Sequence, residues 1–244
     1  MLTKLKSLSL GLRITALALL VLAAVLVVNN VVFVRGYKHS AEVAMVERAK
    51  TFTALADETK NHVSALQGAG VFDQDKLTAE LKADLAAGKP YAETKVFKTI
   101  PVVAGWMAAA EAAKRENIEF NTPAFSARNK KNEPAAGSFE GEVLRDLVAQ
   151  AAAGTGDDIH RFDQATNTLH YMRAIRLDQS CMVCHGDPAT STTKDGKDPV
   201  GFAMENWKIG DVHGAFHVVL PMEPVDNTDM IAQLAQFSAL EAME

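Results

Sequence analysis

The strongest feature of the hydrophobic pattern is an apolar run near the N-terminus, from Ile14 to Val34, interrupted by three polar residues. At about 21 residues it is long enough to cross a hydrocarbon core of roughly 30 Å as a helix. Three basic residues precede the run, namely Lys4, Lys6 and Arg13, and no acidic residue occurs before Glu42. The positive-inside rule then predicts a cytoplasmic segment at residues 1–13, a single membrane span at 14–34 and an exported remainder. An uncleaved signal anchor is favoured over a cleaved signal peptide, because no small-x-small cleavage site ends the run.

A long helical pattern follows over residues 36–70, and it carries a heptad seam. The seam consists of Met45, Ala49, Phe52, Ala56, Thr59, Val63 and Leu66. Two alternatives remain open for it: the seam packs on its own domain, or it pairs with a second copy of the chain in a homodimer.

The remaining pattern predicts a mixed domain at residues 71–226. Helices are expected at residues 75–87, 101–116 and 139–153. Strands are expected at residues 118–127, 158–162, 168–177 and 214–220, the last nearly all apolar. A polar loop is expected over residues 187–208, and an amphipathic helix over 227–244. Antiparallel strands with helices packed on one side predict an α+β domain.

Composition and charge narrow the class of partner. Hydrophobic residues make up 48% of the 244 residues, which indicates a packed core rather than disorder. The net charge is -5 and no long basic run occurs, so nothing favours nucleic-acid binding. The expected partners are therefore a membrane and another protein.

Candidate chemistry is concentrated in the pentapeptide Cys-Met-Val-Cys-His at residues 181–185, which holds the only two cysteines of the chain. Two thiols three positions apart lie on one side of a helical turn, so both can form thioethers to the vinyl groups of one porphyrin. His185 can then give an imidazole nitrogen to the iron. The motif predicts one covalently attached haem c, held by Cys181, Cys184 and His185 as proximal ligand.

The cysteine pair also allows other interpretations. A structural disulfide or a thioredoxin-like couple does not explain the following histidine, and no early strand-to-helix pattern surrounds the pair. A structural zinc site needs about four ligands, whereas the other histidines are scattered along the sequence. Haem c attachment accounts for more of the motif than these alternatives.

Several segments also resemble a known family of single-haem c domains. These segments are Ile100–Trp106, Arg128–Asn132, Tyr171–Arg176, Cys181–Gly186 and Trp207–Phe216. The family has a PAS-like fold and is often the extracytoplasmic input domain of bacterial histidine kinases and methyl-accepting chemotaxis receptors. The likeness covers roughly residues 40–225 and implies haem bound against a PAS-like antiparallel sheet with flanking helices.

The chain departs from the family pattern in two ways. Lys130 stands where the family often has proline after Arg-Asn, which predicts a looser loop. Some members use a cysteine of the N-terminal helices as second axial ligand, but this chain has no third cysteine. His62 on the long helix and Met204 in the polar loop are the candidate distal ligands instead, although simple packing competes for both.

Haem propionates need cationic partners, and the guanidinium groups of Arg128, Arg173 and Arg176 match a carboxylate best. Internal salt bridges compete equally for these arginines. Tyr171, in the same matched segment as two of them, is also predicted to contact the haem. Four histidines near the strands are secondary candidates for propionate contact, with a satisfied surface position as the default; they are His160, His170, His213 and His217.

These features predict a single-pass inner-membrane protein with its haem domain in the periplasm or outside the cell. The preferred function is a redox or gas sensory input module, which needs a signalling partner or further chain, because no kinase or second span occurs among these residues. The alternative is a membrane-tethered monohaem cytochrome that carries electrons to a partner. An enzyme is not expected, since no distal acid–base pair is recognisable.

Overall fold

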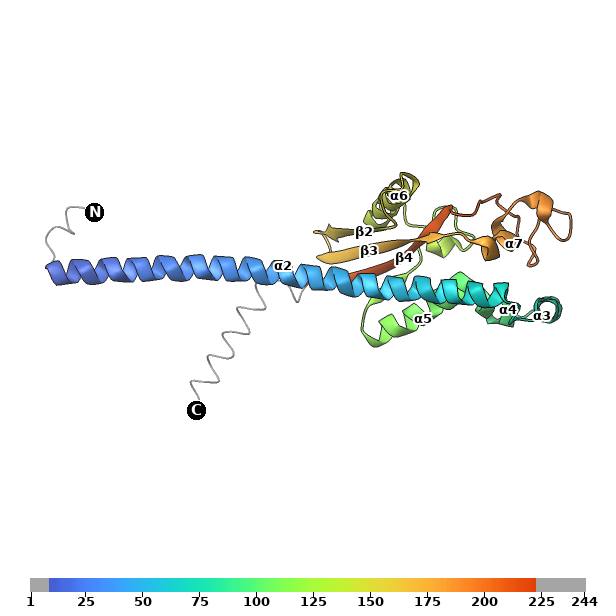
Figure 1. The fold of residues 1–244 in the computed structure, drawn as a ribbon, viewed down its shortest axis with the longest axis horizontal. Helices are drawn as coiled ribbons and strands as arrows, with labels where there is room; N and C mark the ends of the chain where they lie inside the picture. The colour runs from blue at the N-terminus through green and yellow to red at the C-terminus, as the bar shows by residue number, and fades with distance from the viewer. Residues whose placement is uncertain (1–8, 223–244) are drawn as a thin grey trace, which may run out of the picture. The chain divides into compact units, whose positions relative to one another are not determined.

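The computed structural model of the chain describes residues 9–222 (Figure 1). The chain divides into two compact units, one of residues 1–44 with 222–244 and the other of residues 45–221. The helix expected at residues 227–244, as well as Lys4 and Lys6, lies outside the described residues.

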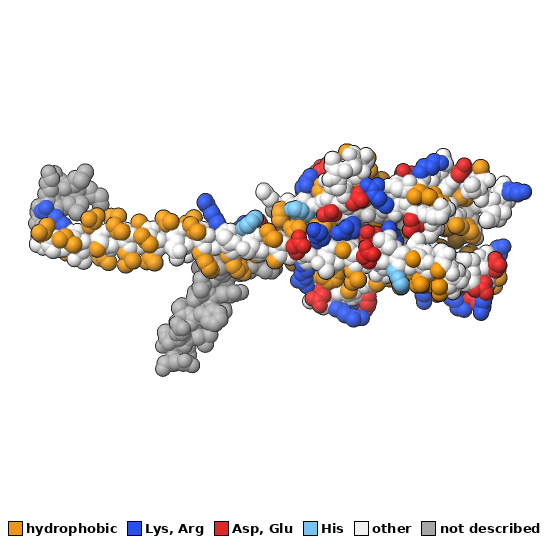
Figure 2. Space-filling model, in the orientation of Figure 1, with side chains coloured by type: hydrophobic (Ala, Val, Ile, Leu, Met, Phe, Trp, Pro, Cys, Tyr) orange, Lys and Arg blue, Asp and Glu red, His pale blue; other side chains and the backbone are white. Residues whose placement is uncertain are grey.

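The described part of the first unit is the beginning of helix α2 (Leu10–Gly68). Its apolar window has a mean hydropathy of 2.8 and none of it is buried against protein. Hydrophobic side chains cover this part of α2 in Figure 2, and Leu17, Leu20 and Leu26 are each at least 59% exposed. A helix of this length and composition fits a membrane anchor or a signal sequence.

The second unit is built on a four-stranded antiparallel sheet with the strand order β1-β4-β3-β2. The strands are β1 (Glu119–Asn121), β2 (Asp158–Asp163), β3 (Thr168–Arg176) and β4 (Val212–Pro221). The two longest strands lie side by side at the centre, where Met172 pairs with His217. The α+β class, with an antiparallel sheet and flanking helices, is confirmed.

Helices lie on both faces of this sheet rather than on one, as Figure 1 shows. The helices of the unit besides α2 are α3 (Gln74–Ala86), α4 (Lys95–Thr99), α5 (Pro101–Arg115), α6 (Phe139–Ala152) and α7 (Met182–His185). Leu144 and Leu147 of α6 pack on Met172, whereas α2 and α5 pack on Ile175 and Phe216. Neighbouring positions of β3 point to opposite faces, and the apolar character of β4 allows burial on both.

The strand predicted at residues 118–127 is wrong in length, because β1 ends at Asn121. Proline at position 123 has no N–H for the ladder, although its carbonyl still accepts from Ala215 N at 3.0 Å. The next residue donates instead to the carbonyl of Asn132, at 3.0 Å, which closes a loop at the start of the second half. The chain therefore leaves the sheet at Pro123.

Helix α2 packs on its own domain from Ala49 onward. The buried positions are Ala49, Thr53, Ala56 and Lys60. Ala49 and Ala56 belong to the predicted seam, whereas Thr53 and Lys60 each lie one residue after a seam position. The departure has polar causes: Arg173 Nε donates to Thr53 Oγ1 at 3.3 Å, and Lys60 Nζ donates to the carbonyl of Arg176 at 3.3 Å. Packing within the domain thus occupies this face, while homodimerisation stays a prediction.

Close contact between α2 and α5 depends on Gly105. A Cβ at this position would collide with the carbonyl oxygen of Ala56 and would lie 3.3 Å from Cβ of Lys60. Because both obstacles belong to a rigid helix, we expect Gly105→Ala to cost about 1–3 kcal/mol in the free energy of unfolding. Chemical denaturation measures this value. Gly68→Ala is the control, since nothing lies within 4 Å of a Cβ there, and an equal loss in both variants contradicts the argument.

Candidate functional site

The Cys-x-x-Cys-His segment forms a compact turn just after the central strand β3. Asp178 begins it by capping the 3-10 helix η3 (Gln179–Cys181): its Oδ1 accepts from Ser180 N at 2.8 Å, and its own N–H donates to Cys181 Sγ at 3.4 Å. Helix α7 (Met182–His185) follows at once. Cys181 and Cys184 therefore lie on successive short turns, and both are half-buried and free of any disulfide.

The thiols of this turn are weaker acids than a free cysteine. Burial raises the pKa of Cys184 to about 11, and the charge of Asp198 adds to this effect. Burial also raises the pKa of Cys181. Reactive redox cysteines have a lowered pKa, so both thiols here are protonated and the arrangement disfavours a thioredoxin-like couple.

His185 is held by a carboxylate on one side of its ring. Its Nδ1 lies 3.0 Å from Oε2 of Glu205, while Nε2 has no hydrogen-bond partner among residues 9–222. Burial, followed by the charge of Arg128, lowers the pKa of His185 and favours the neutral imidazole. A neutral ring with Nδ1 engaged presents the Nε2 lone pair, which is the form that a metal ligand requires.

The chain after His185 is fixed by backbone contacts with the polar loop. The carbonyls of His185 and Gly186 accept from Trp207 N at 2.8 Å and from Asn206 N at 3.0 Å. A Cβ at position 186 would lie only 2.5 Å from the carbonyl oxygen of Met182, so the tight exit from α7 requires glycine. These contacts bring Glu205 beside the imidazole.

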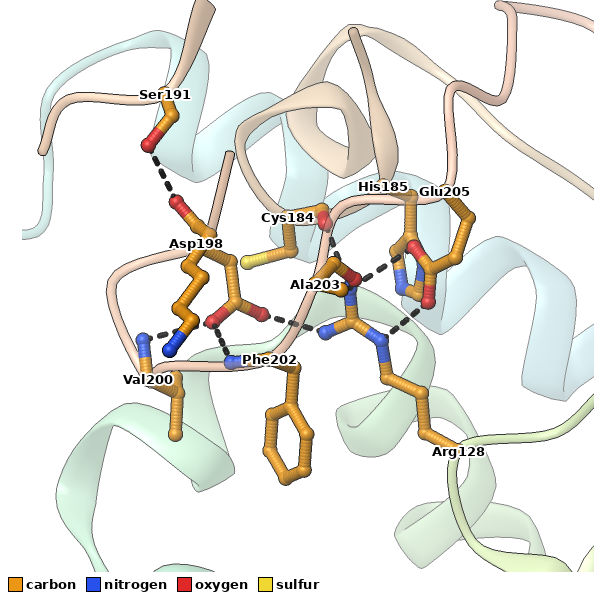
Figure 3. Close-up of polar contacts among 10 residues, drawn as sticks. Arg128, Cys184, His185, Ser191, Asp198, Val200, Phe202, Ala203 and Glu205 are labelled. Atoms are coloured by element: carbon orange, nitrogen blue, oxygen red, sulfur yellow. Dashed lines mark hydrogen bonds and ion pairs between the residues drawn. The ribbon is translucent and has the colours of Figure 1, made fainter. Parts of the chain in front are cut away.

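Arg128 lies at the centre of the polar cluster behind the motif (Figure 3). Its Nη1 is 2.5 Å from Oδ2 of Asp198, and its Nε and Nη2 bind the carboxylate of Glu205 at 2.5 and 2.9 Å. Nη2 also donates to the carbonyl of Cys184 at 2.7 Å. One guanidinium thereby ties the turn of the cysteines to the loop that carries Glu205.

Asp198 anchors the loop from its buried side. Its side chain has no exposed surface, and Oδ1 accepts from Val200 N and Phe202 N at 2.9 Å each.

The loop predicted at residues 187–208 is confirmed as mostly irregular, with the turn η4 (Pro188–Thr190) and one isolated bridge between Lys197 and Ala203. Despite Lys130, the segment that follows Arg128 is ordered as η2 (Lys130–Asn132), capped by Asn129.

The other predicted cofactor contacts lie on the sheet. Tyr171 is 1% exposed and its hydroxyl donates to Oδ2 of Asp158 at 2.7 Å. Arg176 pairs with Asp157 at 2.5 Å, and Arg173 contacts Thr53 of α2. Arg128 alone among these residues contacts the cysteine turn directly, and the propionate role of the arginines stays a prediction.

Among residues 9–222, no hydrogen bond or ring contact joins either predicted distal ligand to the cysteine turn. His62 is exposed on α2, about 200° around the helix from Ser64, whose hydroxyl donates to Asp178. Met204 is 7% exposed in the polar loop, next to the residue that binds Nδ1. The identity of the distal ligand therefore stays a prediction.

Several residues of the site were not expected from the sequence. Glu205 and Asp198 stand in a polar loop with many similar residues, and only the fold selects them. His213 was assigned a surface position, but its ring packs 5.0 Å from that of His185 and 4.9 Å from that of Trp207, and its Nδ1 is buried with no partner among the described residues.

A second pair of histidines, also assigned to the surface, lies on the two central strands, where His217 is buried and His170 is half-buried. His217 is 1% exposed; its Nδ1 contacts Glu140 Oε1 at 2.9 Å and its other ring nitrogen contacts His170 at 3.0 Å. As strand alternation predicts, these histidines face α6, opposite to Tyr171 and Phe216. The surface assignment of His217 is wrong because Glu140 and Asn121 satisfy its ring inside the protein.

Burial of His213 predicts an acid-sensitive fold. Burial, followed by the charge of His185, lowers the pKa of His213 from 6.5 to about 4. The folded state thus favours the neutral ring, so its stabilising contribution is complete above pH 6.5 and is lost as the pH falls towards 4. One pKa unit corresponds to about 1.36 kcal/mol, so the loss at pH 4.5 is on the order of 2 kcal/mol.

Chemical denaturation at pH 7 and pH 4.5 measures this effect on the purified protein. In His213→Phe the ring contact with Trp207 is retained and the titrating group is gone. Its stability should therefore fall less than that of the wild type over the same interval. Equal losses in the two proteins contradict the assignment to His213.

Comparisons with known proteins add the following. The Tll0287-like family model, described as Tll0287, matches residues 38–221. Among solved structures, the crystal structure of the cyanobacterial heme-protein Tll0287 aligns at 19% identity, with a TM-score of 0.39, over 64% of this chain and 94% of its own. No curated protein matches this chain.

Proposed function

Since the chain belongs to the Tll0287-like family, we propose that it binds one haem covalently through Cys181 and Cys184, with His185 as the proximal ligand. The match confirms the family resemblance seen in the sequence, and the family carries the name of a cyanobacterial haem protein. We further propose that the haem domain faces outward from a membrane and acts as a redox or gas sensory input module.

The proposal rests on the groups that the cysteine turn offers to a haem, namely two thiols and one imidazole nitrogen. Two free, protonated thiols stand on adjoining helical turns, and the following imidazole has Nδ1 engaged and Nε2 available. Addition of an S–H bond across a vinyl group forms a thioether without any oxidant, so reduced thiols are the form required. The residues therefore fit haem c, which supplies a one-electron iron centre when bound.

The preference for a sensor over an electron carrier rests on the placement of the two candidate distal ligands. His62 is exposed on α2, and Met204 is buried in the polar loop next to Glu205. Among residues 9–222, no hydrogen bond or ring contact joins either side chain to the cysteine turn, so neither is held in place as the second protein ligand that is typical of an electron carrier. We therefore favour ligand-dependent signalling.

Membrane attachment is supported by α2, whose first part is apolar and exposed along its length. The basic residues before it favour a cytoplasmic N-terminus and export of the haem domain. A chain that remains in the membrane after a carbonate wash supports the anchor, whereas a processed chain in the periplasmic fraction indicates a cleaved signal sequence.

Visible spectra of the full chain, expressed with a cytochrome c maturation system, test the function. We expect one haem per chain and a ferrous spectrum that changes on addition of CO. Colourless protein contradicts haem attachment. A six-coordinate spectrum in both oxidation states, without any response to CO, contradicts the sensor and supports the electron carrier.

A further inference from the structure

We propose that Glu205 is a positioning residue that fixes the tautomer of His185 and lowers the reduction potential of the bound iron. This inference rests on the proposed function, because it concerns the proximal ligand of the haem. It adds a residue that lies outside the Cys-x-x-Cys-His motif, in the loop that follows it.

The contact between the two side chains is direct and partly shielded from water. Glu205 Oε2 lies 3.0 Å from His185 Nδ1, and the side chains are 28% and 21% exposed. A neutral imidazole has one N–H, and a carboxylate can only accept it. The proton therefore resides on Nδ1 and leaves the Nε2 lone pair for the metal.

Glu205 is kept anionic and in place by Arg128. Two nitrogens of the guanidinium bind the carboxylate at 2.5 and 2.9 Å in a fork, which is the strongest geometry for such a pair. Arg128 is itself fixed by Asp198 and by the carbonyl of Cys184. The carboxylate thus cannot turn away from His185 without breaking several hydrogen bonds (Figure 3).

The imidazole ring is held from its other sides as well. Trp207 N donates to the carbonyl of His185, and the ring of His213 packs against the imidazole at 60° between planes. Loop and ring contacts together fix the plane of His185. The structure therefore presets both the orientation and the protonation of the ligand before haem is attached.

A fixed negative charge on the carboxylate that accepts the Nδ1–H hydrogen bond makes the imidazole a stronger electron donor. Stronger donation stabilises the ferric state relative to the ferrous state, so the reduction potential falls. Glutamine in place of Glu205 can still accept the Nδ1–H hydrogen bond, but it carries no charge. Glu205→Gln thus separates the electrostatic effect from simple orientation.

Spectroelectrochemical titration of the haem-loaded full chain tests this. We expect Glu205→Gln to raise the ferrous-to-ferric ratio at a fixed potential about tenfold, which is 59 mV for a one-electron couple. Glu140→Gln is the matched control. Its carboxylate contacts Nδ1 of His217 at 2.9 Å, but that histidine pairs with Met172 in the sheet, away from the cysteine turn.

An unchanged potential in Glu205→Gln, or an equal change in Glu140→Gln, overturns the inference. Should Glu205→Gln not fold, the wild type supplies the second measurement: the Nδ1 proton of His185 is expected to exchange slowly in proton NMR spectra, and fast exchange contradicts the contact. Covalent haem in the wild type is measured first. Its absence overturns the proposed function itself, so the two failures are distinguishable.

Discussion

A Cys181→Ala/Cys184→Ala variant is expected to lose all haem that survives denaturation, while its chain still folds. Both cysteines are half-buried on two short turns, and neither belongs to the buried core around Leu144 and Phe216. Their removal therefore abolishes the thioether bonds and leaves the packing of the sheet nearly intact. Haem staining of a denaturing gel and the intact mass of the chain measure the loss, and circular dichroism checks the fold.

Val183→Ala is the matched control for this variant. Val183 lies between the two cysteines and its side chain is 57% exposed, so its truncation changes the same turn without touching a thiol. It should retain a full complement of covalent haem. Haem staining that persists in the double variant, or that is lost equally in Val183→Ala, would contradict attachment through these sulfurs.

The turn that carries the two cysteines and the histidine is the part of the candidate site that the sequence predicts best, because its residues are contiguous. Cys181, Cys184 and His185 need only one turn of backbone to become neighbours, and local capping by Asp178 supplies that turn. The same holds for α6 and β3, whose bounds lie within one residue of expectation, since short-range periodicity determines both.

The residues of the candidate site that were missed depend on contacts between distant segments. Glu205 reaches His185 only because Arg128, 77 residues earlier, binds its carboxylate and anchors the loop. The loop contains several acidic residues, and no local pattern distinguishes this one from Asp195 or Asp187. Periodicity reports the burial of a face, but it does not report which polar side chains meet across a fold.

The length of strand β1 and the buried stripe of helix α2 also differ from the prediction. The apolar pattern after Ile118 favoured a long strand, but one proline removed the donor that the ladder needed. The buried stripe of α2 is displaced from the seam because Thr53 and Lys60 accept from and donate to residues of strand β3, at Arg173 and Arg176. A proline of the segment itself decided the first outcome, and contacts with a distant strand decided the second.

Arg128→Leu is the second change with a large expected effect, on stability. It leaves the fully buried carboxylate of Asp198 without its counter-charge, and loss of one partner of a buried pair costs about 3–5 kcal/mol. The two backbone N–H groups that still bind Asp198 place the expected loss near the lower end, at about 3 kcal/mol. Equilibrium denaturation in urea measures it.

The control pair is Arg161 with Asp146, which has a longer separation of 3.4 Å and side chains that are 49% and 56% exposed. Water screens such a pair, so Arg161→Leu should cost at most about 1 kcal/mol.

A second variant, Arg128→Leu/Asp198→Asn, removes the buried charge but leaves a side-chain oxygen for the backbone donors of Val200 and Phe202. It should recover most of the lost stability if the unpaired charge is the cause. Equal losses in the single and double variants would instead assign the effect to the contacts that Arg128 makes with Glu205 and the carbonyl of Cys184.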